Sequence, residues 1–311
     1  MARVLVTGGA GYIGSVLVPL LLEKGHEVTA LDSFMYQQQS LLDCVHSPRL
    51  RIVRGDAADP ELLKREVESV DWIFPLACLT GAPLCEREPA AAQRIILDGL
   101  QSLLQLRHEG QWIVYPTTNS GYGVGEQGIY CDENSPLRPI SLYGRLKVEA
   151  ERRVLEAGHS ITLRLATAFG VSPRMRLDLL VNDFVYRAVT DRFIVLFQGE
   201  FKRNFIHVRD IARAFLHAME HREAMCGEAY NVGLDDANLD KRELCEAIGR
   251  HVSGFTWYEA ELGEDPDKRN YIVSNAKIAD SGYRPQVSLD EGIAELIRGY
   301  QVVRRNQYSN V

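Results

Sequence analysis

Residues 3–14 read RVLVTGGAGYIG, a short apolar run followed at once by a glycine-rich turn. The three spaced glycines have separate uses in such a turn. Gly8 permits the tight bend, Gly11 lets a pyrophosphate approach the backbone, and Gly14 lets the next helix pack closely on the strand. A helix N-terminus also offers N–H donors and positive potential. The stretch therefore predicts a strand, a turn and a helix that together hold a dinucleotide.

Acidic residues at the ends of the next two apolar runs fit the same interpretation. Asp32 follows Gly14 by 18 residues, close to the spacing of about 20 at which a carboxylate binds the adenosine ribose. The neighbouring Ser33 is not basic, which favours NAD over NADP. Asp56 ends the third run after Gly55, where a carboxylate has room to meet the adenine amino group, although Asp is also a common turn residue.

Apolar runs and helical patterns alternate along the first half of the chain. The runs predict strands at 3–7, 27–32, 50–56, 71–77, 112–118 and 160–166, and the patterns predict helices at 12–24, 59–68, 89–107 and 142–156. Such alternation is typical of α/β proteins with a doubly wound parallel sheet of the Rossmann type. We expect Pro19 to kink the first helix or to cost it a hydrogen bond.

The alternation is lost after residue 170. No clean strand–helix unit is visible over 172–200, whereas 205–208 predict a strand and Asp210 opens a helix as its cap. Residues 228–233 predict a strand that returns to the sheet. His207 is expected to be a core or supporting histidine rather than a ligand.

These patterns predict two parts. An NAD-binding Rossmann domain is expected over 1–170, with 205–233 returning to it. A smaller α+β lobe that binds the substrate is expected over 171–204 and 234–311.

The composition narrows the classes of function. With 311 residues, 46% hydrophobic and 25% charged, the chain is ordinary for a globular enzyme. Its net charge of −7 argues against a nucleic-acid partner. The longest apolar run near the N-terminus, 16–22, is too short to span a membrane, and the six scattered cysteines form no C-x-x-C pair. We therefore expect a cytoplasmic enzyme with reduced thiols, no metal site and no membrane partner.

A tyrosine and a lysine, Tyr143 and Lys147, lie four residues apart near the start of the helix expected at 142–156, and hence on one face of it. A phenol is a poor base at neutral pH, and an adjacent ammonium lowers its pKa by stabilising the phenolate. Thr118 ends the strand at 112–118, at the sheet edge where the cofactor is expected. A hydroxyl there can bind the reacting oxygen and share its proton with the tyrosine. These three residues are the candidate catalytic group.

With the glycine turn, Asp32, Thr118, Tyr143 and Lys147 in this order, the chain resembles the extended short-chain dehydrogenase/reductase family. More narrowly, it resembles the NAD-dependent nucleotide-sugar epimerases and dehydratases, in which a serine or threonine lies about 25 positions before the tyrosine, as Thr118 does here. The resemblance implies that Tyr143 takes the proton of a sugar hydroxyl while hydride leaves the adjacent carbon, usually C4, for NAD. Thr118 would orient that oxygen, and Lys147 would tune Tyr143 and hold the nicotinamide ribose.

The resemblance also implies two sets of binding residues. The cofactor-binding residues are Gly8, Gly11, Tyr12, Ile13, Gly14, Asp32, Ser33, Asp56, Ala57, Leu76, Ala77, Cys78, Tyr143 and Lys147. The substrate-binding residues are Thr118, Asn119, Ser120, Asn182, Arg203 and Arg269. The two arginines are expected to grip the diphosphate of a nucleotide sugar, because a bidentate guanidinium suits phosphate oxygens.

The residues after Thr118 separate the subfamilies. Family 4,6-dehydratases carry Asp-Glu or Ser-Glu directly after that residue, UDP-glucuronate decarboxylases carry Glu in the second place, and 3,5-epimerases place a cysteine in this stretch. This chain has Asn119 and Ser120, neither of which can act as a carboxylate acid or base. Dehydration, decarboxylation and 3,5-epimerisation are therefore disfavoured, which leaves oxidation, reduction or epimerisation at C4.

Three stretches narrow the resemblance further. Residues 116–123, 174–184 and 263–274 look like a subgroup that oxidises C4 of GDP-linked manno-heptose. Members of that subgroup keep NAD tightly bound and pass the hydride to a 2-oxo acid such as 2-oxoglutarate. We therefore expect a C4 dehydrogenase of a GDP-linked heptose or hexose. A 4-epimerase of a UDP- or GDP-sugar is the alternative, and a non-catalytic NAD-binding sensor is a third. The family resemblance also implies a homodimer, formed through the helices at 89–107 and 142–156.

Overall fold

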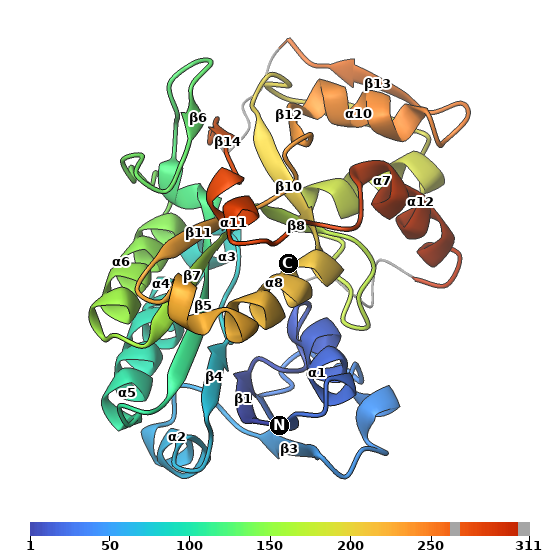
Figure 1. Ribbon diagram of the computed structural model, residues 1–311. Coiled ribbons are helices and arrows are strands. Elements are labelled where there is room, and N and C mark those ends of the chain that lie inside the picture. Colours follow the sequence, from blue (N-terminus) through green and yellow to red (C-terminus); the bar gives the residue numbers. More distant parts are fainter. Residues whose placement is uncertain (262–267, 304–311) are drawn as a thin grey trace.

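A parallel sheet of seven strands runs through the centre of the protein (Figure 1). The computed structural model describes residues 1–261 and 268–303. The strand order is β11-β7-β5-β4-β1-β2-β3, and every neighbouring pair is parallel. The strands are β1 (Arg3–Thr7), β2 (Glu27–Asp32), β3 (Leu50–Arg54), β4 (Trp72–Pro75), β5 (Trp112–Thr118), β7 (Ser160–Leu165) and β11 (Ala229–Val232). The winding reverses between β1 and β4, and the carboxyl ends of these strands therefore open a crevice. The predicted Rossmann-type sheet is confirmed.

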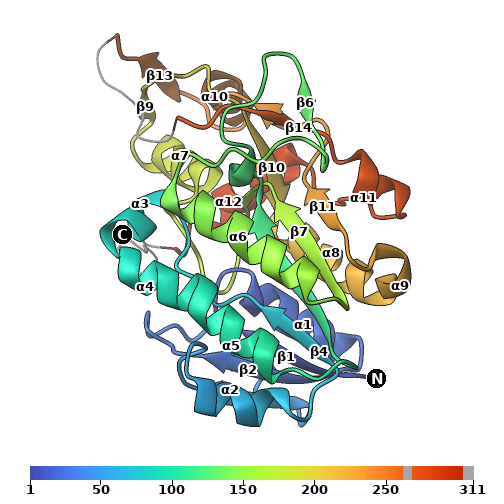
Figure 2. The same ribbon diagram turned by 90° about the vertical axis from the view of Figure 1, so that its left-hand side faces the viewer.

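Helices cover both faces of this sheet, as its apolar strands require. On one face, α1 (Gly14–Glu23) and α8 (Val208–Glu220) share a core with the strands. On the other face, a second core joins the sheet to α2 (Pro60–Val67), α5 (Gly99–Leu106) and α6 (Leu142–Glu156). Figure 2 looks onto this second group of helices.

The helix predicted around Pro19 forms, and the helix predicted at 89–107 differs in detail from the prediction. Pro19 lies inside α1, which nevertheless continues to Glu23. The helix expected at 89–107 forms as α4 (Pro89–Gln93) and α5, joined by a π-helical turn over Arg94–Asp98. Such a turn widens the helix locally and often occurs near functional sites. Here it presents Arg94, which forms an ion pair with Asp56.

The remaining elements are short strands and helices outside the central sheet. Three small sheets are formed by β8 (Thr167–Phe169) with β10 (Arg203–His207) and β12 (Asn238–Leu239), by β9 (Phe193–Leu196) with β13 (Thr256–Glu259), and by β6 (Tyr130–Cys131) with β14 (Ile272–Val273). The further helices are α3 (Ala82–Arg87), α7 (Leu180–Thr190), α9 (Arg222–Met225), α10 (Lys241–Gly249), α11 (Ala276–Asp280) and α12 (Leu289–Gly299). Within 171–204 and 234–311, the ranges of the expected lobe, short strands and helices occur together, as an α+β composition requires. The division of the chain at residue 170 stays a prediction.

The expectation that 172–200 holds no regular unit was wrong. This stretch contains α7 and β9. Asn182 is completely buried within the apolar face of α7, and a polar residue at a buried position hides the helical repeat from a reading of hydrophobic spacing.

Asp210 does not cap α8, contrary to the prediction. The cap is His207, whose Nδ1 accepts a hydrogen bond from the backbone N–H of Arg209 (3.2 Å). Asp210 is buried in the first turn, where its two carboxylate oxygens accept hydrogen bonds from the backbone N–H groups of Gln286 and Val287 (2.9 Å each). Asp210 therefore ties α8 to the C-terminal part of the chain, and His207 is the buried core histidine that was expected.

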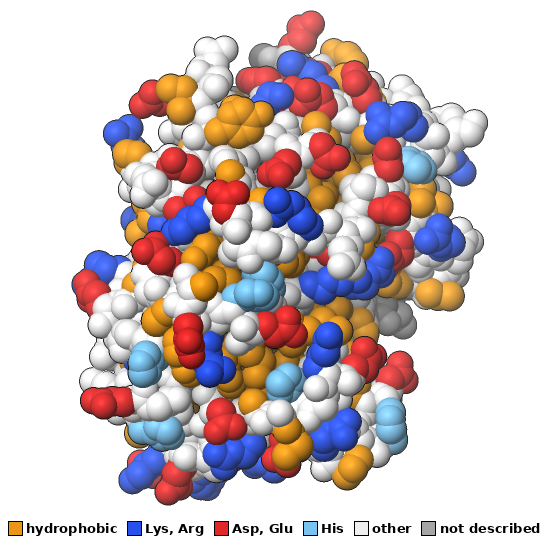
Figure 3. All heavy atoms as spheres, in the orientation of Figure 1, with side chains coloured by type: hydrophobic (Ala, Val, Ile, Leu, Met, Phe, Trp, Pro, Cys, Tyr) orange, Lys and Arg blue, Asp and Glu red, His pale blue; other side chains and the backbone are white. Residues whose placement is uncertain are grey.

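The surface mixes charges of both signs. Figure 3 shows acidic and basic side chains interspersed over one face of the molecule. Within residues 1–261 and 268–303, the structure contains no helix with both the length and the apolar character needed to cross a membrane.

Candidate active site

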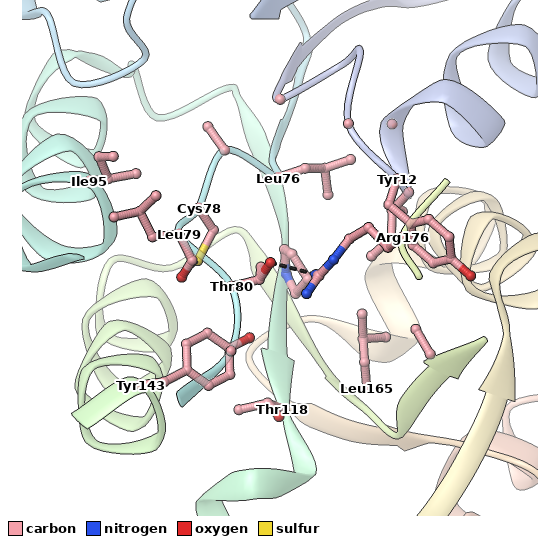
Figure 4. A pocket seen from close by; sticks show the side chains of 18 of the residues that line it. Tyr12, Leu76, Cys78, Leu79, Thr80, Ile95, Thr118, Tyr143, Leu165 and Arg176 are labelled. Carbon is pink, nitrogen blue, oxygen red and sulfur yellow. Dashed lines mark hydrogen bonds between the residues drawn. The ribbon is translucent and has the colours of Figure 1, made fainter. Parts of the chain in front are cut away.

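A cavity of about 310 Å³ opens at the carboxyl ends of the central strands (Figure 4). Its walls come from the glycine turn, the segment after β4, the end of β5, the start of α6 and the segment 165–179. All 14 residues expected to bind the cofactor line this cavity, and so do Thr118, Ser120 and Arg269. The structure thus brings residues from distant parts of the sequence to one place.

The glycine turn has no room for side chains. Gly8 has a φ of +69°, and a Cβ there would stand 2.7 Å from the backbone nitrogen of Ala77. A Cβ on Gly14 would stand 2.7 Å from the Cα of Gly9. The turn closes through a hydrogen bond from the N–H of Gly11 to the carbonyl of Gly8 (2.9 Å). It leads into α1, whose first N–H groups lack partners within the helix, so this bare cradle fits the diphosphate of a dinucleotide.

Asp32 lines the cavity from the end of β2, and the protein itself orients its carboxylate. One oxygen accepts a hydrogen bond from the N–H of Ala10 (3.0 Å). The other accepts from the N–H of Phe34 (2.8 Å) and from Nε2 of Gln38 (3.1 Å). Because a carboxylate offers about four acceptor positions, Asp32 retains capacity for a ribose hydroxyl.

The sequence allowed two interpretations of Asp56, a turn residue or a contact with adenine. Its hydrogen bonds are those of a turn residue. One carboxylate oxygen accepts from the N–H of Ala58 (2.9 Å) and the other pairs with Arg94 (2.7 Å). Burial alone would raise the pKa of Asp56, but these two partners lower it below its ordinary value. Asp56 is therefore an ionised turn residue on the cavity wall, and its contact with adenine stays a prediction.

Thr118, Tyr143 and Lys147 bound one end of the cavity, which we call the triad end. In Figure 4 Tyr143 projects from its helix into the cavity, near Thr118. The hydroxyl of Thr118 donates to Oγ of Ser120 (2.9 Å) and accepts from the N–H of the same residue (3.1 Å). The ammonium of Lys147 is only 3% exposed and donates to the carbonyl of Pro116 (2.8 Å). The spacing of tyrosine and lysine along α6 thus places both at the cavity, as predicted.

The predicted lowering of the Tyr143 pKa is not the net result. Burial raises the pKa of the Tyr143 phenol well above its ordinary value, and the charge of Lys147 only partly offsets this. Burial opposes the charge on Lys147, yet Tyr115, Cys78 and Tyr143 together keep the pKa of that ammonium raised. At neutral pH the protein alone therefore holds a neutral phenol beside a charged lysine.

Ser120 contacts a residue that is distant in the sequence. Arg269 donates a hydrogen bond to Oγ of Ser120, which links two of the positions predicted to contact the substrate. Asn119 points elsewhere: it is 1% exposed, does not line the cavity, and its amide has no hydrogen-bond partner among the described residues.

Arg203 is likewise not part of the cavity wall. Its side chain is buried, donates to the carbonyl of Lys202 (2.8 Å), and places its guanidinium 5.7 Å from the ring centre of Tyr271. Tyr271 does line the cavity. Arg203 therefore supports the wall from behind, and direct contact with a diphosphate stays a prediction.

Asn182, in α7, has a structural role: its side chain holds the segment 170–176, which follows β8. Its Oδ1 accepts from the N–H of Gly170 (3.0 Å), and its Nδ2 donates to the carbonyl of Arg176 (2.8 Å). It does not line the cavity. The geometry thus gives it the task of shaping the segment 170–176 rather than of touching a substrate.

Hydroxyl groups tie this same segment to the glycine turn. The hydroxyl of Tyr12 donates to the carbonyl of Gly170 (2.7 Å), and Oγ of Ser172 donates to the carbonyl of Tyr12 (2.7 Å). Oγ of Ser15, in the first turn of α1, lies 2.9 Å from Oγ of Ser172. All three hydroxyl-bearing residues are buried. One wall of the cavity is therefore fixed to the cofactor turn.

Two arginines on the cavity wall were not among the predicted site residues. Arg176 reaches across the cavity and donates to the hydroxyl of Thr80 (2.5 Å), as Figure 4 shows. The charge of Arg176 interacts electrostatically with the phenols of Tyr12 and Tyr143. Arg174 lies over the ring of Tyr36, 4.6 Å from its centre. The two basic residues in the irregular run 173–176 were the available signal, but only the fold shows that both enter the cavity.

The acids of the cavity lie apart from the triad end. Among the described residues that line it, the only carboxylates are Asp32 and Asp56. These belong to the ends of β2 and β3, on the sheet side beyond the glycine turn. No described side chain of the lining therefore offers Thr118 or Tyr143 a carboxylate partner.

Comparison with known proteins identifies the family. The model of the NAD dependent epimerase/dehydratase family matches residues 4–233. The chain belongs to this family. NAD is accordingly its cofactor, which the bare glycine cradle and the oriented carboxylate of Asp32 fit. The match covers the glycine turn, all three residues of the triad end and strand β11.

Individual members of the family resemble the chain along nearly its whole length. A dTDP-glucose 4,6-dehydratase of Actinoplanes is 29% identical over 97% of this chain and 98% of its own. UDP-glucuronic acid decarboxylase 1 of Arabidopsis thaliana is 26% identical over 96% of this chain and 70% of its own. The crystal structure of the dTDP-glucose 4,6-dehydratase of Streptomyces venezuelae, with NAD and TYD bound, superposes with a TM-score of 0.81 at 29% identity, covering 96% of this chain and 97% of that one. The chain therefore belongs to a family of enzymes, and the relatives named here act on nucleotide sugars.

Proposed function

We propose that this protein is an NAD-dependent oxidoreductase that acts at C4 of a nucleotide sugar and yields the 4-keto sugar. The observation that carries the proposal is the make-up of the triad end: it has a hydroxyl, a phenol and an ammonium, and no carboxylate among the described lining residues. These groups suffice to move a proton from a hydroxyl. They do not suffice to eliminate water, which needs a further acid and base.

In this proposal each residue of the triad end has one task. Thr118 accepts or donates a hydrogen bond at the C4 oxygen, which orients it. The charge of Lys147 stabilises the phenolate form of Tyr143, and this phenolate takes the proton of the C4 hydroxyl and becomes a neutral phenol. NAD, when bound, would supply the hydride acceptor. Burial of Tyr143 and Lys147 strengthens the interaction between their charges, because water is largely excluded.

The substrate is proposed to be a GDP-linked heptose or hexose. Residues 116–123 and 174–184 carry this resemblance within the described chain, whereas residues 263–267 of the third similar stretch, 263–274, lie outside it. In this proposal Arg269, which lines the cavity and donates to Ser120, binds a diphosphate oxygen through its guanidinium. The tight retention of NAD and the use of 2-oxoglutarate as final hydride acceptor belong to the same proposal.

The names of the two relatives described above, a dehydratase and a decarboxylase, indicate that they catalyse dehydration and decarboxylation. Asn119 is buried away from the cavity and Ser120 bonds to Arg269, so neither position supplies the acid or base that such reactions use in the family. A 4-epimerase uses the same proton and hydride transfers as a C4 dehydrogenase, and the cavity suits both. The two enzymes differ in what happens to the hydride: an epimerase returns it to C4, whereas the dehydrogenase passes it to an external acceptor.

The decisive experiment incubates the purified protein with GDP- and UDP-linked sugars and follows the products by NMR and the cofactor by absorbance at 340 nm. A ketone whose yield rises with added 2-oxoglutarate supports the dehydrogenase. A C4 epimer formed without any acceptor supports the epimerase instead. Tyr143→Phe should lower kcat by about 10³-fold, as expected for loss of a general base. A Tyr143→Phe variant as fast as wild type would contradict both.

Further measurements address the remaining parts of the proposal. Failure of every nucleotide sugar to reduce the bound cofactor would favour a non-catalytic NAD-binding sensor. A homodimer, proposed through the surface of α4, α5 and α6, predicts a mass of twice 35.0 kDa by light scattering.

A further inference from the structure

A second tyrosine, Tyr115, contacts the lysine of the triad end. The ammonium of Lys147 donates to the hydroxyl of Tyr115 (3.1 Å) and lies 4.3 Å from the centre of its ring. The same ammonium donates to the carbonyl of Pro116, the next residue of β5. Lys147 is thus held by a hydroxyl, a ring face and a backbone oxygen, all from one strand.

Tyr115 does not touch the space where substrate and cofactor would lie. It is 3% exposed and belongs to the second hydrophobic core, between the sheet and helices α5 and α6. It is absent from the residues that line the cavity. Tyr115 can therefore act on the reaction only through residues that line the cavity, and Lys147 is the one whose ammonium it holds.

The contact matters because a lysine side chain is flexible. Its four-carbon stem carries about 1.5–2 kcal/mol of rotamer entropy that must be lost when the ammonium is fixed. An ammonium has three N–H donors, and two of them are engaged by Tyr115 and Pro116. The remaining donor and the charge are left for the cavity side, where Cys78 and Tyr143 interact with the ammonium.

We propose that Tyr115 is a positioning residue, which fixes the ammonium of Lys147 in place before the reaction through its hydroxyl and its ring. The proposal rests on the proposed function, because it assigns Tyr115 a task for a lysine that acts in that reaction. Tyr115 fixes the position of the Lys147 ammonium, whereas Tyr143 takes the proton in the proposed reaction. A phenylalanine at position 115 would keep the ring contact and lose the hydrogen bond, whereas a leucine would lose both.

The test measures the lysine itself as well as turnover. Protein labelled with ¹⁵N-lysine and loaded with NAD gives ammonium signals by NMR, and Lys147→Arg assigns the signal of Lys147. In Tyr115→Phe we expect hydrogen exchange of this ammonium to accelerate about fivefold, the effect of one hydrogen bond. We expect kcat to fall by a similar factor while KM for the nucleotide sugar stays within twofold, and Tyr115→Leu to show larger changes of both kinds.

Tyr283→Phe is the matched control. Tyr283 is also buried, and its hydroxyl donates to the carbonyl of Asp210 (2.6 Å), far from Lys147 in the chain. This variant loses a buried hydroxyl too, but its Lys147 exchange and kcat should equal those of wild type.

The outcomes separate this inference from the proposed function. If wild type converts no nucleotide sugar, the proposed function fails, and the exchange rate of Lys147 still decides whether Tyr115 holds it. If wild type is active and Tyr115→Phe leaves either the exchange rate or kcat unchanged, the positioning role is refuted. A rise in KM with unchanged kcat would also refute it, because a positioning residue for the lysine should not govern substrate affinity.

Discussion

Replacing Gly14 by alanine adds one methyl group where the glycine turn meets helix α1. That Cβ would stand 2.7 Å from both the Cα and the carbonyl carbon of Gly9, whereas ordinary van der Waals contact begins near 3.4 Å. Gly14 lies in the helix and has no positive φ, so the effect comes from contact alone. The carbonyl oxygen of Gly8 would stand closer still. Because all three atoms belong to the backbone, no side-chain rotation can relieve these contacts, and the turn must move by roughly 1 Å away from the helix.

This displacement moves the N–H donors that would bind the diphosphate. A misplacement of about 1 Å at a binding site can cost about 100-fold, so we expect the affinity for NAD to fall roughly 30- to 100-fold. Overpacking of this kind also costs about 1–3 kcal/mol of stability. At about 2–4 °C per kcal/mol for a chain of this size, the Tm should fall by several degrees.

The assay is calorimetric titration of NAD into protein stripped of nucleotide, together with thermal unfolding. Gly249→Ala is the control: it adds the same methyl group at the end of α10, where the nearest neighbour, a ring carbon of Phe255, is 4.0 Å away. The control should bind NAD as wild type does. If Gly14→Ala binds NAD within threefold of wild type and unfolds at the same temperature, this turn is not the cofactor cradle.

Two further predictions address the cavity wall and the core. Arg176 donates to Thr80 and forms an ion pair with Asp178, and its charge acts on Tyr12 at the cofactor turn. Arg176→Met should raise the Kd for NAD about tenfold; an unchanged Kd would show that Arg176 serves only Thr80 and Asp178. Burial lowers the pKa of His207 to about 3, so the unfolded chain binds this proton first and stability falls as the pH drops from about 6.5 towards 3. His207→Asn keeps an acceptor that can cap α8. Between pH 7 and pH 5 its free energy of unfolding in urea should fall by about 2 kcal/mol less than that of wild type. Equal losses in both proteins would assign the acid sensitivity to other groups.

Much of the fold was predictable because the deciding signals are local. The turn at 8–14 needs glycines for steric reasons that any strand–turn–helix shares, and Asp32 follows at the spacing that one helix and one strand impose. Tyr143 and Lys147 share a helix, so their common face follows from the helical repeat. These residues all line one cavity in the structure.

The parts that were missed depend on contacts between distant segments. Arg176 lies in an irregular run, and only the pairing of β8 with β10 and the hydrogen bonds of Asn182 direct it into the cavity. Arg203 carries a suitable charge, but β10 turns it behind Tyr271. The raised pKa of Tyr143 results from burial by the assembled walls, which the spacing of tyrosine and lysine along one helix does not reveal.

The hydroxyl bonds between Tyr12, Ser15 and the segment 170–172 have a consequence for protein engineering. Specificity in such enzymes would be altered most simply by transplanting the substrate-binding part from a relative with another sugar. Here the segment after residue 170, which we propose to bind the substrate, also carries one wall of the cofactor site. A chimera joined near residue 170 would therefore lose its bonds to the cofactor turn unless the recipient supplied matching hydroxyl and carbonyl partners. Under this proposal, substrate choice and cofactor retention are inherited together.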